Sequence, residues 1–482
     1  MKQINTCVLT VVLLSFITAG PLCGTPCHAG MEGADSMHGD TASSDTTPLP
    51  GPGSSGVESS KIFLSAACPT VLIRTDGKPF VLSTDHIMRH PVARLLKQRN
   101  GKELAKLSLE AGSLLGGVYA FLDSQDRLVM VDGRQRIIRI KAEKTNGLHG
   151  PTWSLAIDET ATISSAVTGH CGGSDCDSVV SISPGTAGTI WFATQHSVVG
   201  IYDTAEGSTS WLKLADDERI DNSFSTTSCG RAAIVTSKAL YVLWQDTANQ
   251  PHIAWRHGYD AGTARKPGQL SHGSGATPTF FGPMTGTDYV MITDNADSGI
   301  SLIVRDTEDG HLLCRKSLFT PPLNSGTENS AIGINNTVIV ASTYGYPYPK
   351  YPEGAGDSVP KKADFPGGMV RIDINDCDEP CEACCVIWEN NLRSAAVPKL
   401  STADELIYTI ERRAPSEGPN TTGVDSYYFS VVDFHTGEVL DKSEKIHFGL
   451  FGDTLQMAGN IGQDGVYWQG TLSGVVRITG LH

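Results

Sequence analysis

A unit of several short apolar segments recurs along this chain and constrains the fold more than any other feature. In each unit a small polar stretch enters a first strand, and a turn rich in Gly or Asp leads to a more apolar strand. A turn of the form Asp-x-x-x-Gly, as in "DTEDGHLL" and "DFHTGEVL", then precedes an outer strand. A period of about 40–60 residues with several strands per unit is typical of a β-propeller. Six units begin, 44 to 66 residues apart, near Val180, Phe224, Thr279, Ala331, Val397 and Met457.

The rest of the chain sets the blade number. Residues 113–167 fit a seventh unit, and residues 61–110 fit either an eighth unit or the strand that closes the ring onto the last unit. Leu95, Leu96, Leu104 and Leu107 recur at roughly helical spacing, so we expect one or two short helices near 90–112. We therefore predict an all-β chain, a single β-propeller of seven or eight four-stranded blades spanning 61–482. Two or three unrelated β-sandwiches would not explain why the units keep the same internal order.

The N-terminal residues carry a separate signal. Lys2 precedes the apolar stretch "CVLTVVLLSFITAG", which is short for a bilayer span and is typical of a secretory leader. We predict a signal peptide at 1–29, cleaved after Ala29, with a lipid anchor on Cys23 or Cys27 as the alternative. Residues 30–60 are small, polar and rich in Pro and Gly, which predicts a disordered linker. We expect an exported protein, periplasmic or extracellular.

Charge and cysteine content narrow the class of protein further. The formal net charge of −15 disfavours nucleic acid as a partner, because nucleic acid binds to basic protein surfaces. No later run is long and apolar enough for a transmembrane segment in the mature chain, and we expect a monomer. Of 12 cysteines, three lie in the predicted leader, and most of the other nine should form disulfides in an oxidising compartment. Disulfides are favoured over zinc for "CDEPCEACC" (377–385) and over a metal site for "HCGGSDC" (170–176).

Strand order within a unit decides which connections share a face of the ring. Four antiparallel strands alternate in direction, so the connection into strand one and the connection from strand two to strand three emerge on the same face. In one unit these connections contain "GTENS" (326–330) and "STYGYPYPK" (342–350). The opposite face receives plain turns such as "GINN" and "DTEDG". We therefore expect the unusual polar and aromatic residues to gather on one face.

The residues of that face suit the binding of a small polar molecule, a glycan or a peptide. Carboxylates and amides form hydrogen bonds, a histidine titrates near neutral pH, and tyrosine rings offer stacking surfaces. The alternative for each residue is an ordinary role in capping a turn or stiffening a loop. We predict nine ligand-binding residues at the mouth of the central channel: His272, Asp294, Asn295, Asp297, Glu328, Asn329, Tyr344, Tyr346 and Lys399.

Three segments carry a family resemblance. At "HGSGATPTFFGPMTGTDYVMITDNAD", "TENSAIGINNTVIVASTYGY" and "VPKLSTADELIYT" the chain resembles secreted bacterial proteins grouped with the quinoprotein-like (PQQ-binding-like) β-propellers. The turn "DFHTGEVL" is similar to the Asp-x-x-Thr-Gly turn of quinoprotein repeats. The resemblance covers roughly residues 270–480 well and the first half weakly. It implies the fold and export, and it implies no established activity.

The resemblance also raises an enzymatic alternative, a quinoprotein-like oxidoreductase or lyase that uses the same face. Glu328 or Asp294 would then act as general base, and Lys399 would stabilise a developing oxyanion. Ca²⁺ is a candidate cofactor on Asp294, Asp297 and Glu328, because it prefers oxygen ligands. PQQ is a second candidate, since quinoprotein alcohol dehydrogenases carry a disulfide between adjacent cysteines beside the quinone, as Cys384-Cys385 would. That pair precedes "VIWEN" on an expected outer strand, whereas the quinone sits on the channel axis, which disfavours PQQ.

Overall fold

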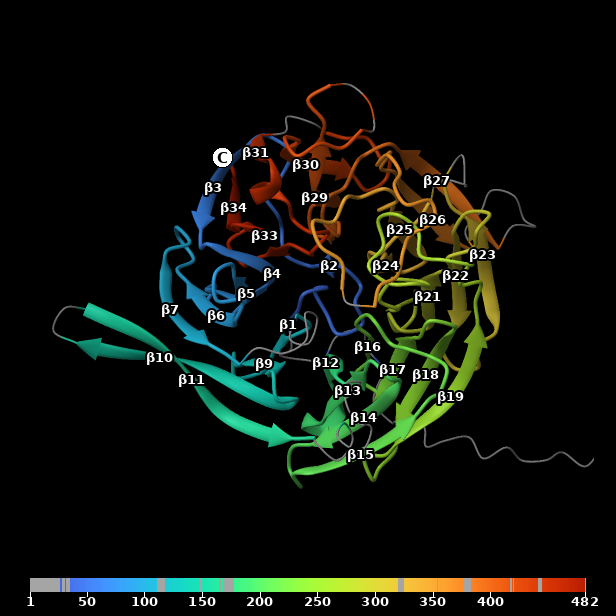
Figure 1. Ribbon diagram of the computed structural model, residues 1–482, viewed down its shortest axis with the longest axis horizontal. Helices are drawn as coiled ribbons and strands as arrows, with labels where there is room; N and C mark the ends of the chain where they lie inside the picture. The colour runs from blue at the N-terminus through green and yellow to red at the C-terminus, as the bar shows by residue number, and fades with distance from the viewer. Residues whose placement is uncertain are drawn as a thin grey trace, which may run out of the picture.

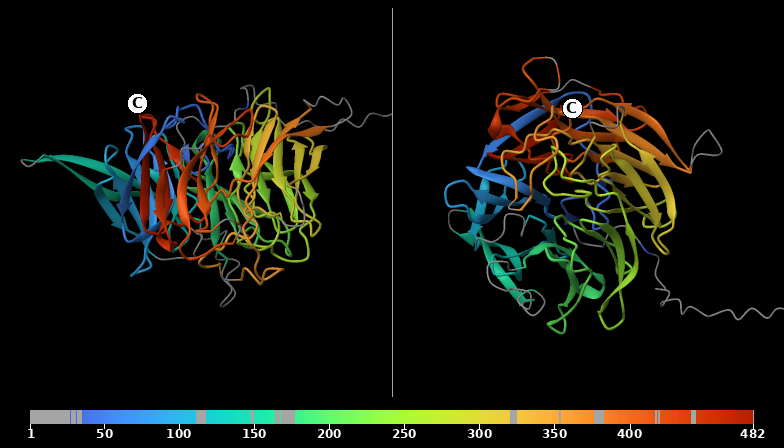
Figure 2. Two further views of the ribbon diagram at one scale, coloured as in Figure 1. Left: turned by 90° about the horizontal axis from the view of Figure 1, so that it is seen from above. Right: turned by 45° about the vertical axis from the view of Figure 1, so that its right-hand side comes forward.

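Eight small antiparallel sheets stand around a central channel like the blades of a propeller (Figure 1). The computed structural model describes residues 27, 31, 35–110, 118–147, 150–163, 167, 177–319, 325–352, 354–375, 383–416, 418, 420–440 and 444–481. The predicted all-β propeller is confirmed, and the blade number is eight. Seen from the side, the blades form a thick disc from which one long hairpin projects (Figure 2).

Each blade runs from an inner strand at the channel to an outer strand at the rim. Blades 1 and 2 contain β4 (Ala66–Ile73), β5 (Pro79–Asp85), β6 (Pro91–Leu96) and β7 (Glu103–Ser108), then β8 (Phe121–Leu122), β9 (Leu128–Val131), β10 (Arg136–Gly147) and β11 (Gly150–Thr162). Blades 3 and 4 contain β12 (Val179–Pro184), β13 (Ile190–Thr194), β14 (Val198–Asp203) and β15 (Ser208–Lys213), then β16 (Ser225–Thr226), β17 (Arg231–Val235), β18 (Ala239–Gln245) and β19 (Pro251–Gly258). Blades 5 and 6 contain β20 (Thr279–Phe281), β21 (Tyr289–Thr293), β22 (Ser301–Asp306) and β23 (Leu312–Ser317), then β24 (Ile332–Ile334), β25 (Thr337–Ala341), β26 (Met369–Ile374) and β27 (Cys384–Asn390).

The last two blades also recruit strands from the N-terminal part of the chain. Blade 7 contains β28 (Lys399–Ser401), β29 (Leu406–Arg413), β30 (Ser426–Asp433) and β31 (Lys445–Phe448), with β2 (Thr46–Thr47) added parallel to β28. Blade 8 contains β32 (Asn460–Ile461), β33 (Tyr467–Thr471) and β34 (Gly474–Gly480), and its outer strand is β3 (Val57–Phe63). Residues 61–110 therefore supply both a blade and part of the closing strand. Among the described residues, two 3-10 turns, η1 (Thr186–Gly188) and η3 (Leu450–Gly452), lie between strands.

The prediction of one or two short helices near 90–112 is wrong. In the described part of that stretch, β6 and β7 form a hairpin in which Ala93 lies opposite Leu107 and Leu95 lies opposite Ala105. Gly101 has a φ of +68°, and its N–H donates to Lys97 O at 2.7 Å. Asn-Gly is a strong hairpin signal, and here the turn overrides the spacing of the leucines.

The apolar core lies between neighbouring blades. One cluster contains Phe121 and Ile137 of blade 2 together with Ile182 and Phe192 of blade 3, all buried. Because each sheet buries both faces against its neighbours, the blades stabilise one another in sequence around the ring. The ring itself positions the connections on two faces. We name the face with the connections into inner strands and from second to third strands the loop face, and the opposite one the turn face.

A strap of the N-terminal chain, residues 35–49, lines the inside of the channel. Asp35–Ser36 is strand β1, which pairs with β8, and β2 belongs to the same strap (Figure 1). The strap carbonyls of residues 41, 42, 44 and 45 accept hydrogen bonds from one backbone N–H in each of four consecutive inner strands. These donors are Thr226, Phe280, Gly333 and Leu400, at 2.8, 3.0, 3.1 and 2.9 Å.

The strap corrects the prediction of a disordered linker over 30–60 for the part that the structure describes. Ala42 and Asp45 have no exposed surface, and residues 57–60 belong to β3. Small polar residues signal disorder in a free chain, but they also fit a narrow channel whose walls are the edges of strands. A disulfide between Cys27 and Cys229 tethers the chain ahead of the strap to blade 4. Of the predicted leader at 1–29, only Cys27 lies within the described residues.

No helix among the described residues has the length and apolarity that a membrane span requires.

Candidate functional site

The nine predicted ligand-binding residues divide into groups with different surroundings. All of them lie on loop-face connections of blades 5 and 6, except Lys399, which begins the inner strand β28. The structure therefore brings their backbones to one side of the ring, but it turns their side chains toward different partners.

Three of the residues hold the connection from β19 to β20 in place, Asn295 and Asp297 from the connection after β21 and His272 from within it. Asp297 Oδ1 accepts a hydrogen bond from Thr263 N at 3.0 Å, and His272 Nε2 lies 3.2 Å from Gly262 O. Asn295 Nδ2 donates to Ala261 O at 2.8 Å and to Ala264 O at 3.1 Å. The connection from β19 to β20 is thus fixed by these side chains. The structural role that the sequence left open as the alternative fits them best.

Asp294 is occupied as well. Its Oδ1 accepts from Ser301 N at 2.6 Å, and its Oδ2 accepts from Arg315 Nη2 at 2.8 Å on the outer strand β23. Burial of this carboxyl raises its pKa, although the Ser301 N–H and Arg315 both favour the charged form. A residue that points to the rim with both oxygens bonded is not placed to act as a general base at the channel.

The two tyrosines are core residues. Tyr346 is 1% exposed, and its hydroxyl donates to Asp453, whose Oδ2 also accepts from Arg412 and Tyr427 at 3.2 Å each. The Arg412 guanidinium lies 5.4 Å from the centre of the Tyr346 ring. Tyr344 is also buried. Neither ring is available for stacking on a ligand at the surface, so this part of the prediction does not fit the structure.

Lys399 belongs to a buried network that fastens the strap. Its Nζ lies 3.1 Å from Asp45 Oδ1, and His38 Nδ1 lies 3.1 Å from the same oxygen. Ser330 Oγ donates to Asp45 and lies 3.0 Å from His38 Nδ1. Burial opposes ionisation of Asp45, but His38 and Lys399 outweigh it, so the pKa of Asp45 is below its usual range. Lys399 therefore compensates a charge of the strap and is not placed to stabilise an oxyanion on the loop face.

Asn329 joins two blades on the inner side of the loop face. Its Nδ2 donates to Gln456 Oε1 at 2.9 Å, and Gln456 Nε2 donates to Ser394 O at 2.8 Å. These contacts satisfy the amide and fix its orientation.

Glu328 is the predicted residue that reaches across the channel mouth. Its Oε1 accepts from Asn222 Nδ2 at 3.3 Å, and Asn222 Oδ1 accepts from the Tyr119 hydroxyl at 2.7 Å. Tyr119, Asn222 and Glu328 precede the inner strands of blades 2, 4 and 6, so this mouth chain spans the ring. Glu328 Oε2 and the Tyr348 hydroxyl are shielded from solvent and have no hydrogen-bond partner among the described residues.

The mouth chain contains a carboxyl group that is largely uncharged at neutral pH. Burial raises the pKa of Glu328 to about 8, and Asp221 adds to the rise, while the Leu270 N–H, Asn222 and Arg265 only partly oppose it. A neutral carboxyl group both donates and accepts hydrogen bonds. The site is therefore suited to polar, uncharged groups.

Sequence reasoning missed Tyr119 and Asn222. Both stand directly before an inner strand, as Glu328 does, so the rule that selected Glu328 would also have selected them. Their partners are 103 and 106 residues away, and nothing in the sequence around them shows those pairings.

The residues do not form the predicted cofactor sites. Asp294, Asp297 and Glu328 each bind different partners and do not form a metal-competent group among the described residues; such a group occurs at Asp306, Asp309 and His311, in a partly exposed turn of blade 5. An exposed acidic turn of this kind carries no inference by itself.

A quinone does not fit the channel as the structure has it. Cys384 forms a disulfide with Cys314 of blade 5, so the adjacent cysteines lie between two outer strands and away from the axis. The strap occupies the channel instead. Between the strap and blades 2 to 4 there remains a cavity of about 30 Å³, little more than the space for one or two waters.

Comparisons with known proteins agree on the fold. No family model matches the sequence, and no curated protein matches it. Among solved structures, it is similar to quinohemoprotein alcohol dehydrogenase from Comamonas testosteroni, with 12% identity, 94% of this chain and 82% of that chain covered, and a TM-score of 0.58. It is also similar to quinohemoprotein alcohol dehydrogenase ADHIIG from Pseudomonas putida HK5, with 12% identity and a TM-score of 0.56. The match covers 92% of this chain and 79% of that chain. At this identity the likeness supports the β-propeller fold alone.

Proposed function

We propose that the protein is an exported binding module that holds an uncharged polar ligand, a glycan or a peptide, over the mouth chain on the loop face. The observation that supports the proposal is the pair of shielded polar groups, Glu328 Oε2 and the Tyr348 hydroxyl, that have no partner among the described residues. Such groups are costly unless something pairs with them, and ligand hydroxyls or amides arriving at the mouth would do so.

Export is supported by the disulfides that join distant parts of the ring. Cys27 pairs with Cys229, and Cys314 pairs with Cys384, as is usual for proteins outside the reducing cytosol. Because Cys27 must remain in the chain to form this bond, we place the end of the leader before Cys27 and not after Ala29.

Binding to arrays of neutral glycans and peptides tests the function, with Glu328 variants measured on the ligands found. Glu328→Leu removes both carboxyl oxygens of Glu328 and is expected to weaken ligand binding about tenfold or more. Glu328→Gln keeps a neutral donor and acceptor, so it should bind like the wild type at pH 7. The wild type should lose affinity as the pH rises through about 8, where Glu328 ionises, and the Gln variant should not.

The matched control is Asp297→Asn, which also changes an acid to an amide on the loop face. Asp297 binds the connection from β19 to β20 and is not part of the mouth chain, so this variant should leave ligand binding unchanged. Folded Glu328→Leu protein with wild-type affinity would contradict the proposal. A visible absorption band or metal retained after dialysis would instead favour the oxidoreductase alternative.

A further inference from the structure

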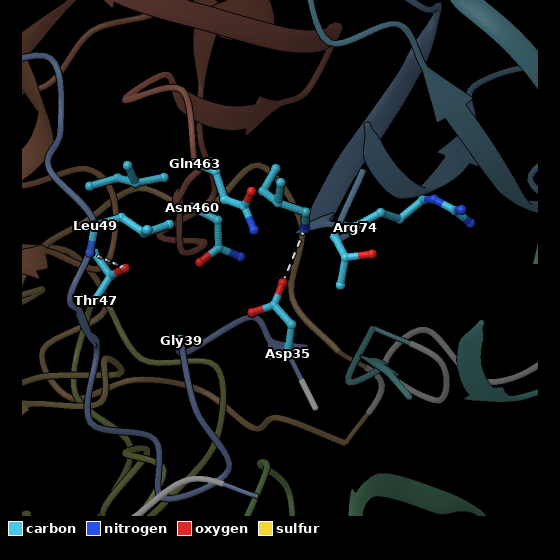
Figure 3. Close-up of a pocket in the computed structure, with 10 residues that line it drawn as sticks. Asp35, Gly39, Thr47, Leu49, Arg74, Asn460 and Gln463 are labelled. Carbon is cyan, nitrogen blue, oxygen red and sulfur yellow. Dashed lines mark hydrogen bonds between the residues drawn. The ribbon is translucent and has the colours of Figure 1, made fainter. Parts of the chain in front are cut away.

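A second cavity, with both polar and apolar walls, lies at the other end of the channel, on the turn face. It has a volume of about 160 Å³ and is enclosed by the strap, by the turn from β4 to β5, and by the inner strand of blade 8 (Figure 3). A cavity of about 150 Å³ accommodates a molecule the size of benzene. The cavity therefore suits a ligand of roughly six non-hydrogen atoms.

One carboxylate points into this cavity from the strap. Asp35 Oδ2 accepts a hydrogen bond from Ile73 N at 3.1 Å, and the carboxylate faces the side chain of Asn460 (Figure 3). Within the described part of the chain, Asp35 forms no ion pair. Asp35 is half-buried. A carboxylate that loses part of its hydration without gaining a cation is destabilised, so its charge remains available to a cationic ligand.

The cationic side chains near the cavity form ion pairs with carboxylates other than Asp35. The Arg74 guanidinium extends away from the cavity in Figure 3 and pairs with Asp76 at 3.2 Å and with Asp126 at 3.8 Å. Lys399 pairs with Asp45. Burial raises the pKa of Asp35 to about 7; Asp126 adds to the rise, whereas the Ile73 N–H and Lys399 oppose it.

The other walls are mixed in character. Leu49 and Ile73 supply aliphatic surface, and the side chains of Thr47, Asn460 and Gln463 supply polar groups. Asn460 Nδ2 donates to Val71 O at 2.7 Å, which leaves the amide oxygen as the group able to accept a hydrogen bond. A short aliphatic segment ending in a hydrogen-bond donor matches such a lining.

We propose that this cavity is a binding site for a small primary amine in its ammonium form, independent of the loop-face site. The ammonium group pairs with Asp35 and donates to Asn460, and the aliphatic part packs against Leu49 and Ile73. The whole protein has a net charge of −15, which favours the approach of cationic over anionic ligands.

Calorimetric titration of the full-length protein with n-butylammonium chloride, and with 1-butanol as the neutral analogue, tests the site. We expect saturable one-to-one binding of the ammonium ion at pH 8.5 and no measurable binding of the alcohol. Affinity should fall about tenfold at pH 6, because a carboxyl group with a pKa of about 7 is then about nine-tenths protonated. The other charged groups that act on Asp35 are Lys399 and Asp126.

Asp35→Asn should weaken binding about ten- to a hundredfold, the range for a lost charge-assisted hydrogen bond, and should abolish the pH dependence. The control Asp76→Asn makes the same change on the adjacent turn outside the cavity lining, and it should stay within about twofold of the wild type. Equal binding of 1-butanol, or a folded Asp35→Asn protein with wild-type affinity, would overturn the proposal. If Asp35→Asn does not fold, the pH series and the alcohol comparison on the wild type decide the matter alone.

Discussion

Lys399 carries a positive charge into the channel, where its side chain is 1% exposed and Asp45 is fully buried. A buried ion pair adds little net stability compared with an apolar pair, because both charges must be desolvated. Removal of one partner, however, leaves the other charge buried without compensation. The contact at 3.1 Å joins residues 354 positions apart, Asp45 in the strap and Lys399 in blade 7. Breaking it is therefore expected to weaken the attachment of the strap to the ring.

We expect Lys399→Met to lower the free energy of unfolding by about 3–5 kcal/mol, the usual cost of an uncompensated buried charge. Chemical denaturation at pH 7 measures it. Adding Asp45→Asn to this variant should recover part of the loss, because the unpaired charge is then removed. A stability of Lys399→Met equal to that of the wild type would mean that Asp45 does not depend on Lys399.

The order of strands along the chain was enough to predict on which face of the ring the candidate residues lie. It was not enough to predict where their side chains point. The antiparallel alternation of strands assigns Asp294, Glu328 and Tyr346 to one face from the sequence alone. Asp294 turns to Arg315 at the rim and Tyr346 to Asp453 in the core, while Glu328 crosses the mouth. These directions depend on partners that are close only after the ring has closed.

At the scale of elements, the strap is the least predictable part of the fold. The hydrogen bonds that join it to four inner strands are made between backbone groups, so no side-chain pattern records those four contacts. The strap turns at Gly39, which has a φ of +90°. A Cβ placed there would lie 2.5 Å from the carbonyl oxygen of Thr46. Glycine is required at this position for both reasons.

Gly39→Ala should therefore loosen the strap, and Gly53→Ala should serve as its matched control. Gly53 also has a positive φ, +77°, but a Cβ there meets nothing within 4 Å. The control should cost about 1 kcal/mol for its backbone conformation, and Gly39→Ala more, because Thr46 must move. Hydrogen exchange of the Phe280 and Gly333 amides, which donate to the strap, should accelerate in Gly39→Ala alone. Equal protection in both variants would show that the turn tolerates a side chain.

At the scale of the whole molecule, the recurring unit was enough to predict a ring, because each blade repeats one strand order. It left open whether residues 61–110 add a blade or close the ring, since either use needs apolar strands with a turn between them. The structure uses the region for both: β4 to β7 form blade 1, and β3 completes blade 8 beside β34. Closure therefore joins residues 57–63 and 474–480 in a single sheet, and we expect the stability of the ring to depend on β3.

Proline substitutions in β3 can test that dependence, because the two strand positions differ in where their N–H groups point. Leu64 N donates to Ser473 O and Leu481 N donates to Gly56 O, both at 2.9 Å, so even-numbered residues of this strand face β34. Ser60→Pro removes an N–H that faces β34, whereas Lys61→Pro removes one that faces away, and both side chains are exposed. We expect Ser60→Pro to lower the free energy of unfolding by about 1–2 kcal/mol more than Lys61→Pro, within one cooperative thermal transition of the ring. If both variants melt at the same temperature, pairing of β3 with β34 is not what holds the ring closed.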